Sequence, residues 1–111
     1  EIPWDPLNKI FLSSNSRNLN EVKKFISTND VSTAFHDYKI RSKKSFELLN
    51  KINHENVFKV FPHKVFCNKN NGKTCLVHNT NNIFYFDSEH LSITGATMLH
   101  EEVLKIINTF E

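Results

Sequence analysis

One stretch organises the sequence: residues 84–96, FYFDSEHLSITGA. Its first residues are aromatic and apolar and predict a buried strand. A polar turn follows, with an acid and an imidazole three residues apart, Asp87 and His90. Ser92 is a good helix N-cap residue, so we expect a helix over residues 92–110. Open α/β sheets place their chemistry at the carboxyl ends of strands, which is where this turn would lie.

The spacing of Asp87 and His90 suits the chemistry of acyl transfer. A serine that attacks an ester needs a base to remove its proton, and histidine has a pKa near neutrality. A carboxylate bonded to the imidazole fixes its tautomer and orientation. Three residues apart on one turn, the carboxylate can fold back towards the ring. An Asp-x-x-His taken alone is most often a solvated loop, but the flanking Leu91-Ser92 and Gly95-Ala96 favour a site.

The run D-x-x-H-L-S-x-x-G-A resembles the last conserved block of the SGNH hydrolases, in the form found in SGNH domains fused to bacterial membrane O-acyltransferases of the acyltransferase-3 type. The preceding pattern is similar as well: residues 60–62 (VFP), then Cys67, then Cys75, then the aromatic run. Residues 2–6, IPWDP, look like the Pro-rich linker of that family.

This resemblance implies a fold and a chemistry. The fold would be α/β, part of a flavodoxin-like three-layer domain with a small parallel or mixed sheet and flanking helices. His90 would be the general base and Asp87 the carboxylate that orients it, whereas Ser92 would cap the helix and not act as nucleophile. The reaction would be transfer or hydrolysis of acetyl-like esters on cell-surface polysaccharide, with no cofactor and no metal.

The resemblance also implies partners and a location. The partners would be an acylated carbohydrate or acyl donor, the upstream part of the same SGNH domain and a membrane acyltransferase domain. The location would be periplasmic or extracytoplasmic, with the parent protein anchored in the inner membrane.

The sequence departs from the family at the nucleophile. It has no G-D-S and no Gly-x-Asn block, and its two glycines, Gly72 and Gly95, precede no plausible nucleophile. One explanation is that residues 1–111 are a single domain that forms the C-terminal portion of a longer SGNH domain; the start at Glu1 instead of Met also suggests a fragment or processed product. The alternative is a degenerate, non-catalytic relative, acting as a secreted or periplasmic binding module.

Two cysteines, Cys67 and Cys75, flank a loop that contains the turn sequence Asn-Asn-Gly. A disulfide is favoured, because the short polar loop would otherwise be loose, and it would indicate an oxidising compartment. Two free buried thiols are a second interpretation. A zinc site that combines both cysteines with His78, and with His63 as a fourth ligand, is a third, although the spacing matches no standard zinc module.

Composition excludes several classes of function. The net charge is +2, and the only clusters of basic residues, Lys23-Lys24 and Lys43-Lys44, fall in predicted helices, so no nucleic-acid partner is expected. No apolar run is long enough to span a membrane, and no signal peptide is visible.

The rest of the chain predicts the supporting elements. Two prolines favour an extended segment over residues 1–12, with Trp4 as a packing anchor. Asn18 and Glu21 form a capping-box pattern that begins a helix ending near residues 28–30.

Further along, a second helix is expected over residues 42–53. The sequence VFKVF, residues 57–61, predicts a strand buried on both faces. A hairpin should then pair residues 74–78 with 83–86 around an Asn-rich turn. Gly95 within the last helix suggests a close approach of that helix to the sheet.

Overall fold

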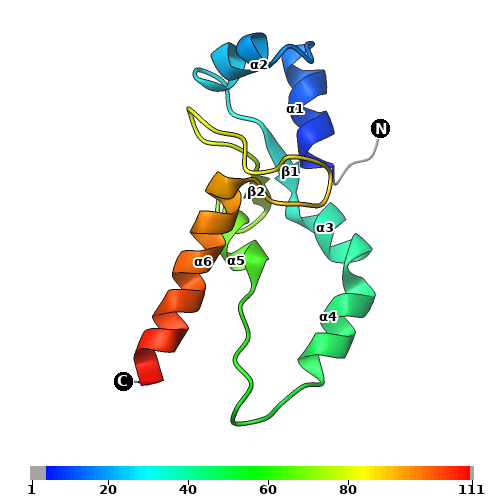
Figure 1. The fold of residues 1–111 in the computed structure, drawn as a ribbon. Helices are drawn as coiled ribbons and strands as arrows, with labels where there is room; N and C mark the ends of the chain where they lie inside the picture. The colour runs from blue at the N-terminus through cyan, green and yellow to red at the C-terminus, as the bar shows by residue number, and fades with distance from the viewer. Residues whose placement is uncertain (1–4, 111) are drawn as a thin grey trace.

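The computed structural model describes residues 5–110, which form short helices around a small sheet (Figure 1). The elements in chain order are α1 (Pro6–Ser14), α2 (Leu19–Ile26), β1 (Ser32–Ala34), α3 (Phe35–Arg41), α4 (Lys43–Asn50), α5 (Pro62–Phe66), β2 (Thr74–Leu76), α6 (Ile93–Ile107) and the 3-10 turn η1 (Asn108–Phe110). None of the helices in residues 5–110 is both long and apolar enough to cross a membrane.

The N-terminal segment is helical, so the predicted extended entry is wrong from residue 6 onwards. Pro6 occupies the first turn of α1, where a missing N–H costs nothing. The Asp5 carboxylate caps the helix by accepting a hydrogen bond from Asn8 N–H at 3.0 Å. Asn15 ends the helix in the left-handed conformation, at φ 53°. The prediction for Trp4 lies outside the described residues.

Helix α2 begins where the sequence predicted. The Asn18 side chain accepts hydrogen bonds from the N–H groups of Asn20 and Glu21, at 3.0 and 3.2 Å. The return half of the capping box is made through a third residue: the Glu21 carboxylate accepts from the Ser16 hydroxyl, and Ser16 Oγ accepts from Asn18 N–H at 3.0 Å. Helix α4 also confirms its prediction, with Ser42 as the residue before it.

The sheet differs from the expected one. β1 and β2 pair antiparallel, with Thr33 opposite Cys75, and residues 5–110 contain no parallel pair of strands. The α/β class is therefore supported only as helices with a small sheet, and the flavodoxin-like layout stays a prediction. The segment 57–61 forms no strand, and Val57 and Phe58 are 46% and 52% exposed, so the prediction of a doubly buried strand is wrong.

The predicted hairpin forms only in part. Bridges connect His78 with Ile83 and Tyr85 with Leu91, and Phe84 N–H donates to the Val77 carbonyl at 2.9 Å. These bridges replace the strand expected at the start of the 84–96 stretch. The turn at residues 79–82 closes through the Asn79 side chain, which accepts from two backbone N–H groups. No residue of this turn needs a positive φ.

A disulfide joins Cys67 and Cys75 and confirms the favoured interpretation. It ties the end of α5 to β2, and closing a loop of this size contributes roughly 2.5 kcal/mol. Bonded to each other, the two sulfurs cannot bind zinc as thiolates, so the zinc interpretation is wrong. The turn inside the loop uses three positive φ angles, at Asn70, Asn71 and Gly72.

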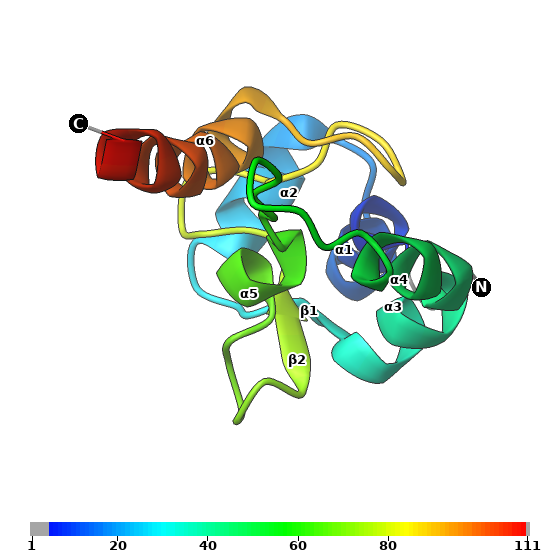
Figure 2. The same cartoon turned by 90° about the horizontal axis from the view of Figure 1, so that it is seen from below.

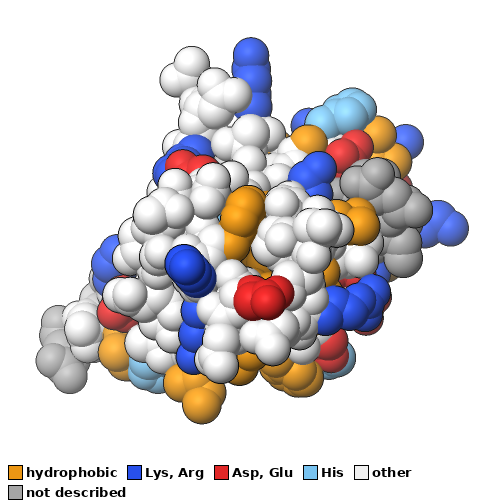
Figure 3. All heavy atoms as spheres, turned by 90° about the horizontal axis from the view of Figure 1, so that it is seen from above, with side chains coloured by type: hydrophobic (Ala, Val, Ile, Leu, Met, Phe, Trp, Pro, Cys, Tyr) orange, Lys and Arg blue, Asp and Glu red, His pale blue; other side chains and the backbone are white. Residues whose placement is uncertain are grey.

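The core lies at one end of the molecule. The central cluster combines one residue of α1, two of α2, the residue before β1 and the residue after β2. They are Ile10, Val22, Ile26, Val31 and Val77. Figure 2 shows α1 and α2 beside the sheet, with α4 and α6 pointing away from it. The end formed by α1 and α2 presents mainly polar and charged side chains (Figure 3).

Candidate catalytic pair on the 84–92 loop

Asp87 and His90 face each other across the turn, as the sequence predicted. His90 Nδ1 lies 2.8 Å from Asp87 Oδ2 and 3.0 Å from Oδ1. This is a hydrogen bond in which Nδ1–H donates to the carboxylate. The bond leaves Nε2 as the ring atom available for a substrate or a hydroxyl, and no hydrogen bond of Nε2 occurs within residues 5–110.

Backbone N–H groups hold the Asp87 carboxylate in place. Its Oδ1 accepts from Glu89 N–H at 2.8 Å and from His90 N–H at 2.7 Å. These two bonds, followed by the bond from the His90 ring, hold the pKa of Asp87 below its usual value. The carboxylate therefore stays charged near neutral pH, which is the form that can orient and stabilise an imidazolium.

The two ends of the loop are fixed to α6 and to each other. Ser92 N–H donates to the Phe84 carbonyl at 2.8 Å, and Ser92 Oγ donates to the Ile83 carbonyl at 2.7 Å. The same Oγ accepts from Gly95 N–H and so caps α6, which confirms its predicted role. The Ser92 hydroxyl is therefore hydrogen-bonded both to the strand side of the loop and to α6, and it is not free to act as a nucleophile.

Gly95 confirms the predicted close approach of α6. A Cβ at this position would fall far inside van der Waals contact with the Phe84 carbonyl oxygen, and would also meet the Leu91 side chain. The missing side chain lets the first turn of α6 lie directly against the base of the loop. The position of Asp87 and His90 relative to α6 thus depends on a glycine.

Two contacts that the sequence did not indicate orient the turn. The Phe86 ring stacks on the His90 ring, with centroids 5.5 Å apart and planes at 23°. Arg41, at the end of α3, forms an ion pair with Glu89. Arg41 and Glu89 are 48 residues apart, so no local pattern could have revealed their pairing.

The pair lies on the surface. The His90 side chain is 67% exposed and that of Asp87 44% exposed. The three hollows described for the structure are lined by other residues, mainly of α3, α4, α5, α6 and the segment 57–61. The geometry can therefore activate a hydroxyl that approaches from outside, but it supplies no substrate pocket of its own from these hollows.

The remaining histidines near the core have structural contacts. His78 is 4% exposed; its Nε2 accepts from Val31 N–H at 2.9 Å and its Nδ1 lies 2.7 Å from the Asn79 carbonyl. His63 stacks on Phe35, and its Nδ1 is a buried atom without a hydrogen-bond partner among the described residues. Burial lowers the pKa of His63, with a smaller contribution from the charge of Lys64. Within residues 5–110 no cluster of three metal-binding side chains occurs.

Comparison with known proteins identifies the family. A family model described as "SGNH domain (fused to AT3 domains)", where AT3 stands for acyltransferase-3, matches residues 3–105. Searches of curated proteins and of solved structures found no match. The matched region contains the whole 84–92 loop and both cysteines. The chain therefore belongs to the family of SGNH domains that are fused to acyltransferase-3 domains.

Proposed function

We propose that this chain supplies the His–Asp half of a Ser-His-Asp site that transfers or hydrolyses acyl esters on cell-surface polysaccharide. His90 is the general base and Asp87 the orienting carboxylate, while the serine belongs to the polypeptide outside residues 1–111. The observation that supports this most is the 2.8 Å contact between His90 Nδ1 and an Asp87 carboxylate that two backbone N–H groups hold in place. The family adds support for acyl-ester chemistry as a class.

The proton moves through His90. As the serine oxygen attacks the ester carbonyl, Nε2 accepts the hydroxyl proton and the ring becomes an imidazolium, which the Asp87 carboxylate stabilises. The tetrahedral intermediate then expels the alcohol, which takes the proton from Nε2 and leaves an acyl-serine. Water or a sugar hydroxyl then attacks this acyl-serine, and His90 again removes the proton of the attacking group. Attack by water gives hydrolysis, and attack by a sugar hydroxyl gives transfer.

We place this reaction on the periplasmic or extracytoplasmic side of the membrane, next to a membrane acyltransferase domain. The Cys67–Cys75 disulfide supports this, because disulfides persist in oxidising compartments. The family description supports the neighbouring membrane domain.

The test is His90→Ala in the parent protein that carries the serine, assayed with an acetyl ester. General-base catalysis is typically worth about 10²–10⁴-fold, and we expect a loss of this size. The matched control is His100→Ala, because His100 is an exposed histidine on α6 away from the pair. Activity of His90→Ala within a factor of about two of the parent would contradict the general-base role.

A second candidate is a non-catalytic binding module that keeps the pair for structure only. The exposure of both side chains favours it, since an active site normally excludes water from its base. A fluorophosphonate probe separates the two: it labels the serine of the parent protein only if that serine is activated. If the parent is labelled and the His90→Ala variant is not, the result supports the enzyme. If the parent is not labelled, the result supports the binding module.

A further inference from the structure

Most contacts that shape the turn with Asp87 and His90 lie within the 84–92 loop itself. The Asp87–His90 hydrogen bond joins residues three positions apart, and the two backbone N–H groups that hold the carboxylate belong to Glu89 and His90. Phe86 N–H donates to the His90 carbonyl at 3.1 Å, and the two rings stack. These contacts fix the shape of the turn, but they do not fix its place relative to the rest of the molecule.

The loop is anchored at its base. Hydrogen bonds of Ser92 and a bridge between Tyr85 and Leu91 hold its two ends together. We call residues 86–90, which lie beyond these bonds, the tip of the loop. A loop that is fixed at its base alone can tilt, and the ring of His90 would tilt with it. A displacement of about 1 Å in a catalytic group can cost about 100-fold in rate, so the tip needs a further support.

One ion pair reaches the tip from another element. Arg41 is the last residue of α3, and its guanidinium pairs with the Glu89 carboxylate. Among the hydrogen bonds, ion pairs and ring contacts within residues 5–110, this pair is the one that joins the tip to a residue outside the loop. Glu89 also donates its N–H to Asp87 at 2.8 Å. The residue that Arg41 holds is therefore a direct partner of the orienting carboxylate.

Helix α3 offers a fixed point for this ion pair. At its start, Phe35 N–H donates to the Lys73 carbonyl at 2.9 Å, and the Phe35 ring stacks on His63 of α5 with centroids 5.3 Å apart. Tyr38 of α3 and Tyr85 of the loop line the same small hollow, of about 60 Å³. Helix α3 is thus attached to the sheet and to α5, and it lies beside the base of the loop.

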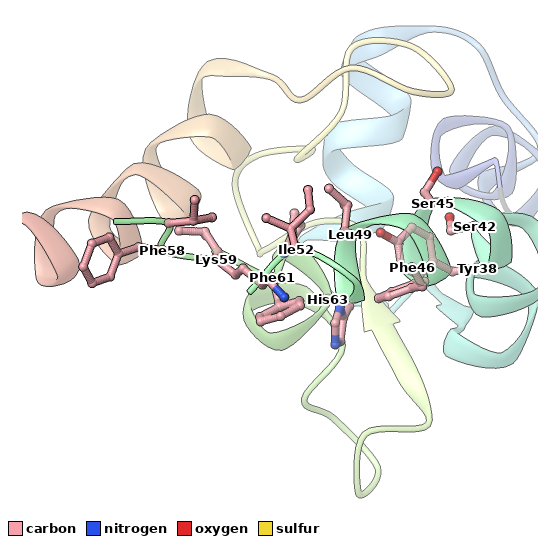
Figure 4. Close-up of a pocket in the computed structure, with 13 residues that line it drawn as sticks. Tyr38, Ser42, Ser45, Phe46, Leu49, Ile52, Phe58, Lys59, Phe61 and His63 are labelled. Atoms are coloured by element: carbon pink, nitrogen blue, oxygen red, sulfur yellow. The ribbon is translucent and has the colours of Figure 1, made fainter. Parts of the chain in front are cut away.

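The Arg41 side chain serves the loop and not the groove on α3. Tyr38 and Ser42 line a groove of about 420 Å³ that α4 and the segment 57–61 also border, and Arg41 is absent from its lining (Figure 4). The side chains of Arg41 and Glu89 are 35% and 56% exposed. An ion pair with this exposure contributes little to the stability of a fold. Its main effect is therefore expected on the position of the tip.

We propose that Arg41 is a positioning residue for the reaction: through Glu89 it holds the tip so that His90 Nε2 meets the serine of the parent protein. Arg41 itself touches no reacting atom. A guanidinium suits this task, because its N–H donors lie in a rigid plane and restrict a carboxylate more than an ammonium does. The inference rests on the proposed function, since it adds a residue to the same site.

The kinetic test is Arg41→Gln in the parent protein, assayed with an acetyl ester. We expect kcat to fall about tenfold, between the roughly fivefold of an exposed ion pair and the roughly 100-fold of a base displaced by about 1 Å. KM should stay within a factor of about two, because a misplaced base slows the chemical step and leaves substrate binding unchanged. The matched control is Lys69→Gln, which removes another exposed long-range ion pair, with Asp30, and should keep the kcat of the parent.

Exchange of the two charges tests the pair itself, since Arg41 makes a further contact besides that with Glu89. Arg41→Glu and Glu89→Arg should each lower kcat, and the double variant should recover most of the loss. A double variant as slow as the two losses multiplied overturns the proposal, and so does an Arg41→Gln variant with a kcat within a factor of about two of that of Lys69→Gln. If Arg41→Gln does not fold, Glu89→Gln provides the same test, because it changes an exposed side chain of the loop.

NMR relaxation of the 111-residue chain tests the tether without an activity assay. In Arg41→Gln the backbone order parameters of residues 87–89 should fall from about 0.85 to below about 0.6, whereas Lys69→Gln should keep them. Unchanged values in Arg41→Gln, or a fall along the whole chain, contradict the tether.

The relaxation result and the His90→Ala result fail independently. A tip that loosens in Arg41→Gln, with an activity that does not depend on His90, would leave the tether intact and remove the proposed reaction. A tip that stays rigid, with an activity that depends on His90, would do the reverse.

Discussion

Two regions of this molecule differ in how many of their apolar residues they bury, although Leu12 on α1 and Leu19 on α2 are also exposed, at 55% and 58%. Around the sheet, α1 and α2 bury Ile10 and Val22 completely, and the disulfide closes the neighbouring loop. In the second region, α4, the segment 57–61 and the end of α6 leave large apolar side chains in solvent. Those at least 41% exposed are Leu48, Leu49, Ile52, Val57, Phe58, Leu104, Ile107 and Phe110.

The overall dimensions agree with this contrast. The radius of gyration is 15.5 Å, whereas a compact domain of this length would have about 13 Å. Figure 1 shows why: α4 and α6 extend away from the sheet as separate arms, and the chain that connects α4 to α5 runs between them. In the packed region around the sheet, apolar side chains of α1 and α2 form the buried core, whereas in the open region of α4, the segment 57–61 and the end of α6 several large apolar side chains are exposed. The turn with Asp87 and His90 lies on the packed region and is linked to α3, which borders the open one.

The largest expected difference between the regions concerns core substitutions. Ile10→Ala should lower the free energy of unfolding by about 2–5 kcal/mol, because it leaves a cavity at a fully buried position. Leu48→Ala on α4 should change it by less than about 0.5 kcal/mol. Chemical denaturation of both variants measures this. If both variants lost the same free energy of unfolding, α4 would be packed in solution and the two regions would not differ in packing.

A smaller effect is expected within α6, which begins in the packed region and ends in the open one. Gly95→Ala should destabilise by about 1–3 kcal/mol through contact with the Phe84 carbonyl, although alanine favours helices by about 1 kcal/mol. Ile107→Ala, at a residue 49% exposed, should cost about 0.5 kcal/mol or less. Thermal unfolding compares the two, and a stabilising Gly95→Ala would show that the loop does not lie against α6.

The smallest effect concerns the charge of Asp87. Its folded pKa is lowered, so its contribution to stability is complete above the unfolded value of about 3.9 and is lost as the pH falls through the folded pKa. Asp87→Asn should therefore lower the melting temperature slightly at pH 7, and the difference from the parent should shrink below pH 4.

The control for this prediction is Glu55→Gln, at an exposed carboxylate between α4 and α5. The melting temperature of Glu55→Gln is measured over the same pH range as that of Asp87→Asn. A difference between Asp87→Asn and the parent that stays constant from pH 7 to pH 3 would mean that the backbone N–H groups do not hold a charged carboxylate.

Local patterns predicted local structure well. The Asn18 cap, the helix after Ser92 and the contact of Asp87 with His90 all follow from residues within a few positions of each other. The prolines near residue 5 were misread, because one proline at the first turn of a helix is compatible with a capped start. The segment 57–61 was misread because its sequence is that of a strand, whereas strand formation needs a neighbour that residues 5–110 do not provide.

The sequence by itself determined the family, the helix caps at Asn18 and Ser92 and the acid–imidazole turn, because each depends on residue type at short spacing. For the two cysteines it favoured a disulfide over two alternatives, and the structure decided between them. Tertiary structure alone decided that β1 pairs antiparallel with β2, that Arg41 holds Glu89, and that large apolar residues of α4 and of the segment 57–61 are exposed. These features depend on which segments, tens of residues apart in the sequence, come into contact. Hydrophobic burial is non-directional, so a local pattern of apolar residues does not specify which segments pair.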